Sequence, residues 1–374
     1  MAVRLEQLDS GFDFEAHKRK AMEDYGKIRL LYLQFSNVVK HIMEKALAEK
    51  KVKVSSIETR AKSIQSFGEK AGESSKNNPN QPKYATPMKD INDMAGIRVI
   101  IFFPNDIKRV DDCIRTEFGV EKYVEHSSSK FQEEQGHFGY QSKHFIIRLK
   151  SRRTVLPEYR PYKDLRAEIQ VRTVLQHAWA EIEHDIQYKS PTNIPEELKG
   201  RFSELAKVLN NADDEFQDIQ KTDDILRTTA RASVKLGDYD QVEITPDSLR
   251  TYLNKRFGSE NTNIDIFYDQ ETDVLHYLGF SNLGQVEECI KGNDNDKISR
   301  LLNSGRLIDN QKVRFEDALI AAMGESYLKD HPLASKTFFQ GDVKRKIKIL
   351  KENNMVVGSY RPKNLDSEQD HLDQ

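Results

Sequence analysis

The spacing of apolar residues in the first part of the chain predicts helices separated by a polar loop. Residues 15–50 contain few helix breakers and many Lys, Glu, Leu and Ala residues, which predicts one long helix. A second helix is predicted at 55–72, with Ser55 or Ser56 as its N-cap. Residues 73–87 are rich in Asn, Pro and Ser, so a loop is expected there.

The middle of the chain alternates between strand-like and helix-like segments. Four segments predict strands and three predict helices, with polar loops between them. The predicted strands are 96–103, 120–125, 139–149 and 163–171, the helices 106–117, 173–189 and 195–221, and the loops 126–138 and 151–162. This alternation predicts a mixed β-sheet flanked by helices, an α+β fold.

A second region begins near residue 222 and is predicted to be mostly helical. Its one predicted hairpin has strands at 263–268 and 273–277 around a turn at 269–272. The predicted helices are 247–257, 283–291, 295–303, 314–328 and 341–352.

The length of 374 residues suggests two or three domains. We predict a first domain at 1–221, a mostly helical C-terminal domain at 222–360 and a polar, disordered tail at 361–374. The chain carries 58 Lys and Arg against 60 Asp and Glu. The resulting net charge of −2 argues against a general nucleic-acid coat but leaves room for a local basic pocket.

The cysteine content and the apolar runs indicate where the protein works. Its two cysteines, Cys113 and Cys289, are too few for a disulfide framework. The N-terminus lacks the apolar core of a signal peptide, and the longest apolar run, Ala318–Met323, is far short of a membrane span. We therefore expect a cytoplasmic protein that does not bind membranes.

The predicted strand 163–171 has one apolar and one polar face. Leu165, Ala167, Ile169 and Val171 alternate with Asp164, Arg166, Glu168, Gln170 and Arg172. The polar face is compatible with a solvated edge strand, and equally with the floor of a charged cleft.

The predicted helix 173–189 has an apolar stripe and an unusual polar stripe opposite to it. The apolar stripe contains Leu175, Ala178, Ile182 and Ile186, and the polar stripe contains His177, Glu181, His184 and Tyr188. Glu181 and His184 have the spacing of a metal-ligand pair on a helix. Carboxylate-bridged metal bundles need this pair twice and the sequence contains it once, so such a metal centre is not favoured.

Charged residues also precede the first predicted strand. Asp90 and Asp93 lie just before Gly96, and a carboxylate entering a strand beside a glycine can present an oxygen ligand to Mg²⁺ near a nucleotide. Three cations of the predicted helix 55–72 could lie toward one side: Arg60, Lys62 and Lys70. Taken alone, each cluster is also compatible with ordinary surface charge.

Four segments together resemble one family, the RelA/SpoT-type alarmone synthetases. They are S-S-I-E-T-R-A-K-S (55–63), D-M-A-G-I-R-V-I (93–100), G-Y-Q-S-K-H-F (139–145) and E-I-Q-V-R-T-V-L-Q-H-A-W-A-E-I-E-H (168–184). The resemblance covers about residues 30–215, so it implies that the first domain is a synthetase domain with a nucleotidyltransferase-like mixed sheet. It also implies a GTP diphosphokinase, which moves the β,γ-pyrophosphate of ATP to the 3′-hydroxyl of GDP or GTP and so makes (p)ppGpp and AMP.

The resemblance also implies roles for individual residues. Asp93 and Glu168 match the catalytic carboxylates that would hold Mg²⁺, the expected cofactor. The matches on the ATP side are Arg60, Lys62, Lys70 and Arg98, and those on the acceptor side are Tyr140, His144, Gln170 and Arg172. The polar stripe of the following helix, His177, Glu181 and His184, could brace Glu168 or Arg172.

Departures from the family pattern lie on the acceptor side. Gly136-His137-Phe138 stands where the family has a Lys-Pro-Asn type stretch, and Lys143 replaces an apolar residue. One alternative is therefore a toxin-type relative that pyrophosphorylates adenosine nucleotides or the 3′ end of tRNA, with the C-terminal domain neutralising or sensing, as in a toxin–antitoxin arrangement. Another is an inactive regulator that binds nucleotides or single-stranded RNA, although the presence of both Asp93 and Glu168 speaks against it.

The remaining expectations concern partners and further domains. Bifunctional relatives carry a hydrolase domain before the synthetase domain, and only some 55 residues precede the predicted helix 55–72, so no hydrolase activity is expected. Family members are often homo-oligomers, and the C-terminal domain could bind a regulatory protein. Its basic cluster of Lys344, Arg345, Lys346, Lys348 and Lys351 could contact RNA, although a solvated helix face is the more common explanation.

Overall fold

The computed structural model describes residues 12–127, 141–189, 196–258, 265–308 and 310–362. The chain forms two compact units, Met1–Ile219 and Gln220–Gln374, which are described separately below. In the described ranges, no helix is long and apolar enough to cross a membrane.

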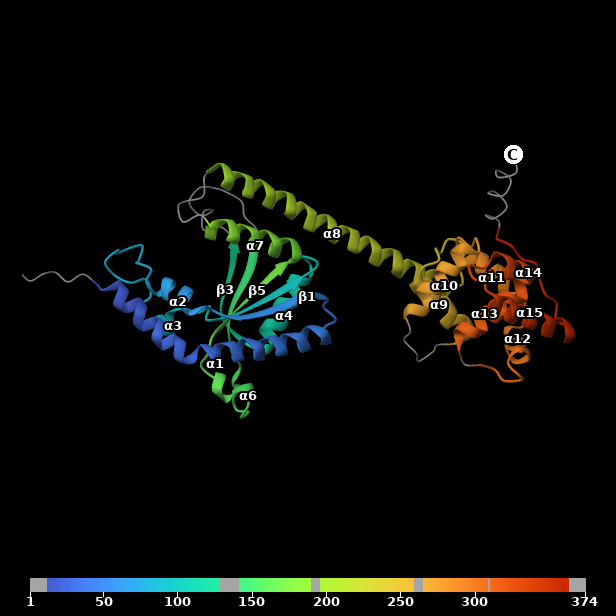
Figure 1. Cartoon of the computed structure of the whole chain (residues 1–374), viewed down its shortest axis with the longest axis horizontal. Coiled ribbons are helices and arrows are strands. Elements are labelled where there is room, and N and C mark those ends of the chain that lie inside the picture. The colour runs from blue at the N-terminus through green and yellow to red at the C-terminus, as the bar shows by residue number, and fades with distance from the viewer. Residues whose placement is uncertain (1–11, 128–140, 190–195, 259–264, 309, 363–374) are drawn as a thin grey trace, which may run out of the picture. The chain divides into compact units, whose positions relative to one another are not determined.

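The first unit is built on a five-stranded mixed sheet (Figure 1). The strand order across the sheet is β1-β2-β5-β4-β3, with β2 and β5 parallel and the other neighbours antiparallel. The strands are β1 Val54–Ala61, β2 Ala95–Ile101, β3 Phe118–Ser127, β4 Gln141–Leu149 and β5 Ala167–Thr173. The predicted mixed sheet flanked by helices is thus confirmed.

Helices cover both faces of this sheet, with α1 and α4 on one side and α7 on the other (Figure 1). The helices are α1 Phe14–Glu49, α2 Ile64–Ala71, α3 Pro87–Asp90, α4 Asp106–Glu117, α6 Ser151–Thr154, the 3₁₀ helix η1 Arg160–Tyr162, α7 Val174–Lys189 and α8 Glu196–Leu236. The predicted helices 15–50 and 106–117 are therefore present, and α8 continues well beyond its predicted end at residue 221.

The long helix α1 closes the apolar core under the sheet. Its N-cap is Asp13, whose carboxylate accepts a hydrogen bond from the backbone N–H of Ala16 at 2.9 Å. Its apolar residues recur every three or four positions and are buried: Tyr25, Tyr32, Phe35, Val39, Ile42, Met43 and Leu47. They join one cluster with the apolar face of β5, namely Ala167, Ile169 and Val171. The polar face of β5 is consequently left on the opposite side of the sheet.

The prediction of a helix over 55–72 is wrong in its first half. Residues Val54–Ala61 form β1, and only Ile64–Ala71 form a helix. Ile57 and Ala61 are buried on one face of β1, and the strand pairs with β2 over its length. Ser63 is the N-cap of α2, accepting a hydrogen bond from the Ser66 N–H at 3.0 Å.

Helix α7 buries a different side from its apolar stripe. Gln176, Trp179 and Glu183 are buried, whereas Ile182 is 54% exposed. The Trp179 ring packs edge-on against Phe202 of α8, with ring centroids 6.0 Å apart. The contact of Trp179 with α8 and the ion pair between Glu181 and Arg98 of β2 therefore orient α7.

In the described residues of the second unit, the regular secondary structure is helical apart from one isolated β-bridge between Glu243 and Asn282. Its helices, after the end of α8, are α9 Pro246–Phe257, α10 Asp265–Tyr277, α11 Leu283–Ile290, α12 Asn295–Leu302, α13 Gln311–Met323, α14 Glu325–Asp330 and α15 Thr337–Glu352. The predicted hairpin is wrong, because α10 occupies residues 265–277. Tyr268, Thr272 and Leu275 are buried at helical spacing, and this pattern outweighs the turn-like residues between them.

The predicted helix 314–328 is divided at Gly324, which has φ +58° and separates α13 from α14. A Cβ at Gly324 would lie 2.5 Å from the carbonyl oxygen of Gly358. Glycine is therefore needed both for the backbone conformation and for the close approach of the segment after α15.

Candidate functional site

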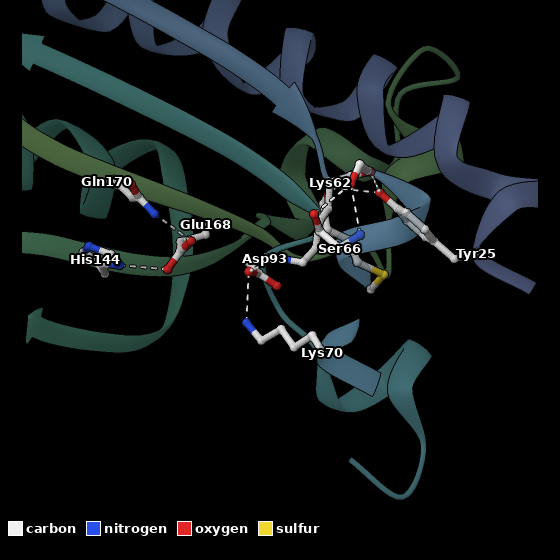
Figure 2. A network of polar contacts seen from close by, with 10 residues as sticks. Tyr25, Lys62, Ser66, Lys70, Asp93, His144, Glu168 and Gln170 are labelled. Carbon is white, nitrogen blue, oxygen red and sulfur yellow. Dashed lines mark hydrogen bonds and ion pairs between the residues drawn. The ribbon is translucent and has the colours of Figure 1, made fainter. Parts of the chain in front are cut away.

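Asp93, immediately before β2, is held by two lysines (Figure 2). The Nζ atoms of Lys62 and Lys70 each lie 2.9 Å from Asp93 Oδ2. Lys62 follows β1, and its backbone N–H donates to the carbonyl of Met94, so the β1–β2 ladder places the lysine beside the carboxylate. Lys70 comes from α2. The structure thus brings two lysines of one predicted cluster to the aspartate of another.

The electrostatics keep Asp93 charged. Burial alone would raise its pKa, but the nearby Lys70 and Lys62 ammonium groups outweigh burial and lower the pKa below its ordinary value. The pKa of Lys70 is raised, because the attraction of Asp93 outweighs the effect of burial. Asp93 Oδ1 is buried without a hydrogen-bond partner in the described part of the chain. One carboxylate oxygen therefore remains available to a ligand or a cation.

Glu168 of β5 is the second buried carboxylate of the site, and it has its own set of partners (Figure 2). His144 Nδ1 lies 2.8 Å from Glu168 Oε1, and Gln170 Nε2 donates to Glu168 Oε2 at 2.9 Å. His144 of β4 is paired directly with Gln170 of β5, so His144, Gln170 and Glu168 share one face of the sheet. Burial would raise the pKa of Glu168, but the hydrogen bonds from His144 and Gln170 outweigh it and lower the pKa.

Asp93 and Glu168 line the same cavity, which has a volume of about 340 Å³. Lys70 and His144 line it too, together with three polar residues to which the sequence had given no role: Tyr84, Asn92 and Lys122. Tyr84 lies near the end of the Asn- and Pro-rich loop, whose composition carries no signal for a site, and its carbonyl lies 3.0 Å from His17 Nε2 of α1. Lys122 lies on β3, where alternation could have placed it on the face of His144.

Arginines form the neighbouring part of the same sheet face. Arg60 of β1 lies opposite Gly96 of β2, and a Cβ at Gly96 would lie 3.2 Å from Arg60 Cγ. The glycine therefore lets the Arg60 side chain lie across β2. Arg98 Nη1 lies 2.9 Å from Glu181 of α7 and 3.7 Å from Glu58 of β1.

The polar stripe of α7 meets these arginines. His177 Nε2 lies 3.7 Å from Glu58, whereas His184 is exposed. Burial, and then the charge of Arg98, lower the pKa of Arg172 to about 10. Burial raises the pKa of Glu183 to about 7, although Arg172 opposes the rise. Glu183 is thus a buried residue beside Arg172 that the two predicted stripes of α7 did not include.

Part of the predicted acceptor side cannot be compared with the structure. Tyr140 and the segment 136–138 fall outside the described residues, so the acceptor side is represented by His144, Gln170 and Arg172. Within the described residues, no group of three or more His, Cys, Asp or Glu side chains could hold a metal ion. A cation at this site would therefore be held by Asp93 and Glu168 together with oxygen atoms of a bound substrate.

Comparison with known proteins identifies the region that carries this site. Residues 59–193 match the family model described as "Region found in RelA / SpoT proteins". The GTP pyrophosphokinase YwaC of Bacillus subtilis (strain 168) is 30% identical over 136 residues, which are 35% of this chain and 59% of that protein. The GTP pyrophosphokinase YjbM of the same strain is 32% identical over 139 residues, which are 36% of this chain and 59% of that protein. The chain thus spans 59% of the length of these two relatives.

Two solved structures are also similar to this chain. The small alarmone synthetase 1 from Bacillus subtilis has a TM-score of 0.43 and 24% identity, with 54% of this chain and 97% of that chain covered. A GTP pyrophosphokinase family protein from Streptococcus pneumoniae has a TM-score of 0.43 and 25% identity, with 54% and 94% covered.

Proposed function

We propose that this chain, whose residues 59–193 match the RelA/SpoT family model, is an ATP:GTP/GDP 3′-pyrophosphotransferase that makes (p)ppGpp and AMP in an alarmone response. One observation carries the proposal: two carboxylates whose side chains are only 15% and 14% exposed, Asp93 and Glu168, are both kept ionised and line one lysine-containing cavity. The curated relatives YwaC and YjbM, which are GTP pyrophosphokinases, support it.

The residues divide the reaction between a donor side and an acceptor side. Lys62 and Lys70 would neutralise the ATP phosphates, and the planar guanidinium groups of Arg60 and Arg98 suit stacking on adenine. Glu168 would accept the proton of the acceptor 3′-hydroxyl as this oxygen bonds to the β-phosphorus of ATP. The bond between the β-phosphorus and the oxygen bridging it to the α-phosphate breaks, and AMP leaves with that oxygen.

The donor set fits Mg²⁺, which we propose as the cofactor. Asp93 Oδ1 is the buried oxygen that lacks a partner among the described residues, and Glu168 lines the same cavity. Both groups are carboxylates, the ligands that this hard cation prefers. When bound, Mg²⁺ would supply charge neutralisation for the pyrophosphoryl group. Lys62 and Lys70 both contact the other oxygen of Asp93, so they leave Oδ1 to the cation.

Transfer of label from γ-labelled ATP tests the function and identifies the acceptor. The full chain is incubated with Mg²⁺ and, in turn, GDP, GTP, ATP or deacylated tRNA. We expect label on GDP and GTP, and we expect Asp93→Asn and Glu168→Gln to abolish it. The matched control is Asp164→Asn, an exposed carboxylate of the segment before β5, which should leave transfer unchanged.

The acceptors separate the possible outcomes of this experiment. Label on tRNA or ATP alone would show that the acceptor is not a guanine nucleotide and would make the chain a toxin-type enzyme. Absence of label on all four acceptors, in the full chain and in a chain ending at Ile219, would refute pyrophosphate transfer and leave a nucleotide-binding regulator.

We also propose that the chain forms a homo-oligomer through an apolar surface of α8. Leu205, Val208, Phe216 and Ile219 follow one side of the helix and are 45% to 61% exposed. These positions are symmetric about Ala212. In an antiparallel pair of α8 helices, Leu205 would face Ile219 and Val208 would face Phe216, which is the self-complementarity that a two-fold axis requires.

A further inference from the structure

A chain of hydrogen bonds runs through the acceptor side of the site. Ser142 Oγ lies 2.7 Å from His144 Nε2, His144 Nδ1 lies 2.8 Å from Glu168 Oε1, and Gln170 Nε2 lies 2.9 Å from Glu168 Oε2. We infer that Ser142 and Gln170 are positioning residues that fix the orientation of the His144–Glu168 pair. The inference rests on the proposed function, in which Glu168 takes a proton from the acceptor hydroxyl.

Gln170 serves Glu168 in this arrangement. Its side chain is 9% exposed, and its Oε1 is buried without a hydrogen-bond partner among the described residues. Among the described residues, the hydrogen bond of the Gln170 amide group is therefore the one to the Glu168 carboxylate. By donating to Oε2 while His144 donates to Oε1, it holds the carboxylate plane from both ends and favours the ionised form. This contact assigns Gln170 to the base rather than to the acceptor nucleotide.

Ser142 holds the other side of the His144 ring. A carboxylate can only accept, so His144 Nδ1 donates to Glu168 Oε1, and the Ser142 hydroxyl lies within hydrogen-bond distance of the second ring nitrogen, Nε2. Contacts at both ring nitrogens fix the orientation of the imidazole, and the buried position of Ser142 on β4 keeps its hydroxyl there.

The arrangement matters because Glu168 has to be ionised and correctly oriented when the acceptor hydroxyl arrives. In the transfer step the proton moves from the 3′-hydroxyl to a carboxylate oxygen of Glu168, and it is released after AMP leaves. The hydrogen bond from His144 Nδ1 remains in place throughout. Loss of either positioning residue should therefore affect the transfer step and not the affinity for ATP.

The division of the loss between kcat and KM tests the role of Gln170. Gln170→Met removes the donor at similar volume, and Gln170→Glu places a second carboxylate beside Glu168. We expect kcat to fall by about tenfold for Gln170→Met and further for Gln170→Glu, while the KM values for ATP and for the acceptor stay unchanged. An unchanged kcat with a raised KM for the acceptor would overturn the inference and place Gln170 on the nucleotide.

Ser142→Ala, with Ser142→Thr as the conservative rescue, tests the other end of the chain. We expect kcat to fall by about tenfold in Ser142→Ala, the loss typical of one bond to a catalytic group, and to recover in Ser142→Thr. Ser151→Ala on α6, outside the cavity, is the matched control. Equal loss of activity in the alanine and threonine variants, with an unchanged pH profile, would show a structural role only.

Nitrogen-15 spectra of the histidine side chains test the inference independently of activity. The signal of His144 is assigned by its loss in His144→Gln. In the wild-type protein the ring should carry its hydrogen at Nδ1, and Ser142→Ala should shift the signal of Nε2, which loses its contact with the serine hydroxyl. If wild-type protein transfers no pyrophosphate but shows these spectra, the proposed function fails and the positioning inference stands. A ring protonated at Nε2 in the wild-type protein would overturn the inference.

Discussion

Replacing Glu183 with Gln should stabilise the first unit at alkaline pH. Glu183 is 7% exposed on the inner side of α7, and burial raises its pKa from an ordinary value of 4.5 to about 7. The folded protein therefore keeps this carboxyl protonated up to about pH 7, whereas the unfolded chain loses the proton above pH 4.5. Because the folded-state pKa is raised, stability is lost as the pH rises through this window.

The pKa values set the size of the effect. A difference of about 2.5 in pKa corresponds to about 3 kcal/mol in the free energy of unfolding above pH 7. Glu183→Gln has no proton to lose, so it should avoid this penalty. It should exceed the wild type by about 1 to 3 kcal/mol at pH 8, since it also forfeits the attraction of Arg172 to a charged Glu183. The two proteins should differ little at pH 4.5.

Trp179 is a local reporter for this prediction. It is the single tryptophan of the chain, is 2% exposed and lies on the same helix as Glu183, so urea unfolding followed by its fluorescence reports on the first unit. Glu204→Gln on α8 is the matched control, because Glu204 forms an ion pair with Lys207 at the surface and its side chain is 72% exposed. A stability difference between Glu183→Gln and the wild type that is the same at pH 4.5 and pH 8 would refute the reasoning.

Three further predictions follow from individual contacts. Gly96→Ala should raise the KM for ATP by about tenfold with little change in stability, because the new Cβ, 3.2 Å from Arg60 Cγ, displaces that guanidinium; initial rates at varied ATP check this. Lys70→Met should raise the pKa of Asp93 and move the acid limb of kcat to higher pH, since one of the two cations that lower this pKa is lost; an unmoved limb in the pH–rate profile would contradict it. Val208→Glu should convert the proposed oligomer to monomers without loss of fold, as checked by light scattering after size-exclusion chromatography; an unchanged mass would exclude the α8 surface.

Local sequence patterns determined the elements whose environment is uniform along their length. Strict alternation along β5 predicted the buried face of Ala167, Ile169 and Val171, and all three are buried. The predicted helix 106–117 coincides with α4 at both ends. In these segments, one residue in two, or one in three to four, is apolar and faces the core, so periodicity alone is sufficient.

Other elements depended on contacts between distant parts of the chain. Residues Val54–Ala61 became a strand because β2 offers seven paired positions, an advantage that local propensity does not contain. Helix α7 buries Gln176 and Glu183 and leaves Ile182 exposed. Gln176 accepts a hydrogen bond from the backbone N–H of Thr173, and Glu183 feels the charge of Arg172, both residues of β5. Hydrophobic spacing along α7 cannot predict this burial, since these partners belong to another element.

The site illustrates the same division. The sequence by itself supplied the candidate groups, because carboxylates, lysines and arginines occur at the positions that the family resemblance assigns to pyrophosphate transfer. Only the tertiary structure decided which side chains meet: the β1–β2 ladder brings Lys62 to Asp93, and the β4–β5 register brings His144 to Glu168. A hydrogen bond depends on distances of a few tenths of an ångström between atoms of different strands. Those distances are set by strand pairing and by helices packed on the sheet, and no local pattern encodes them.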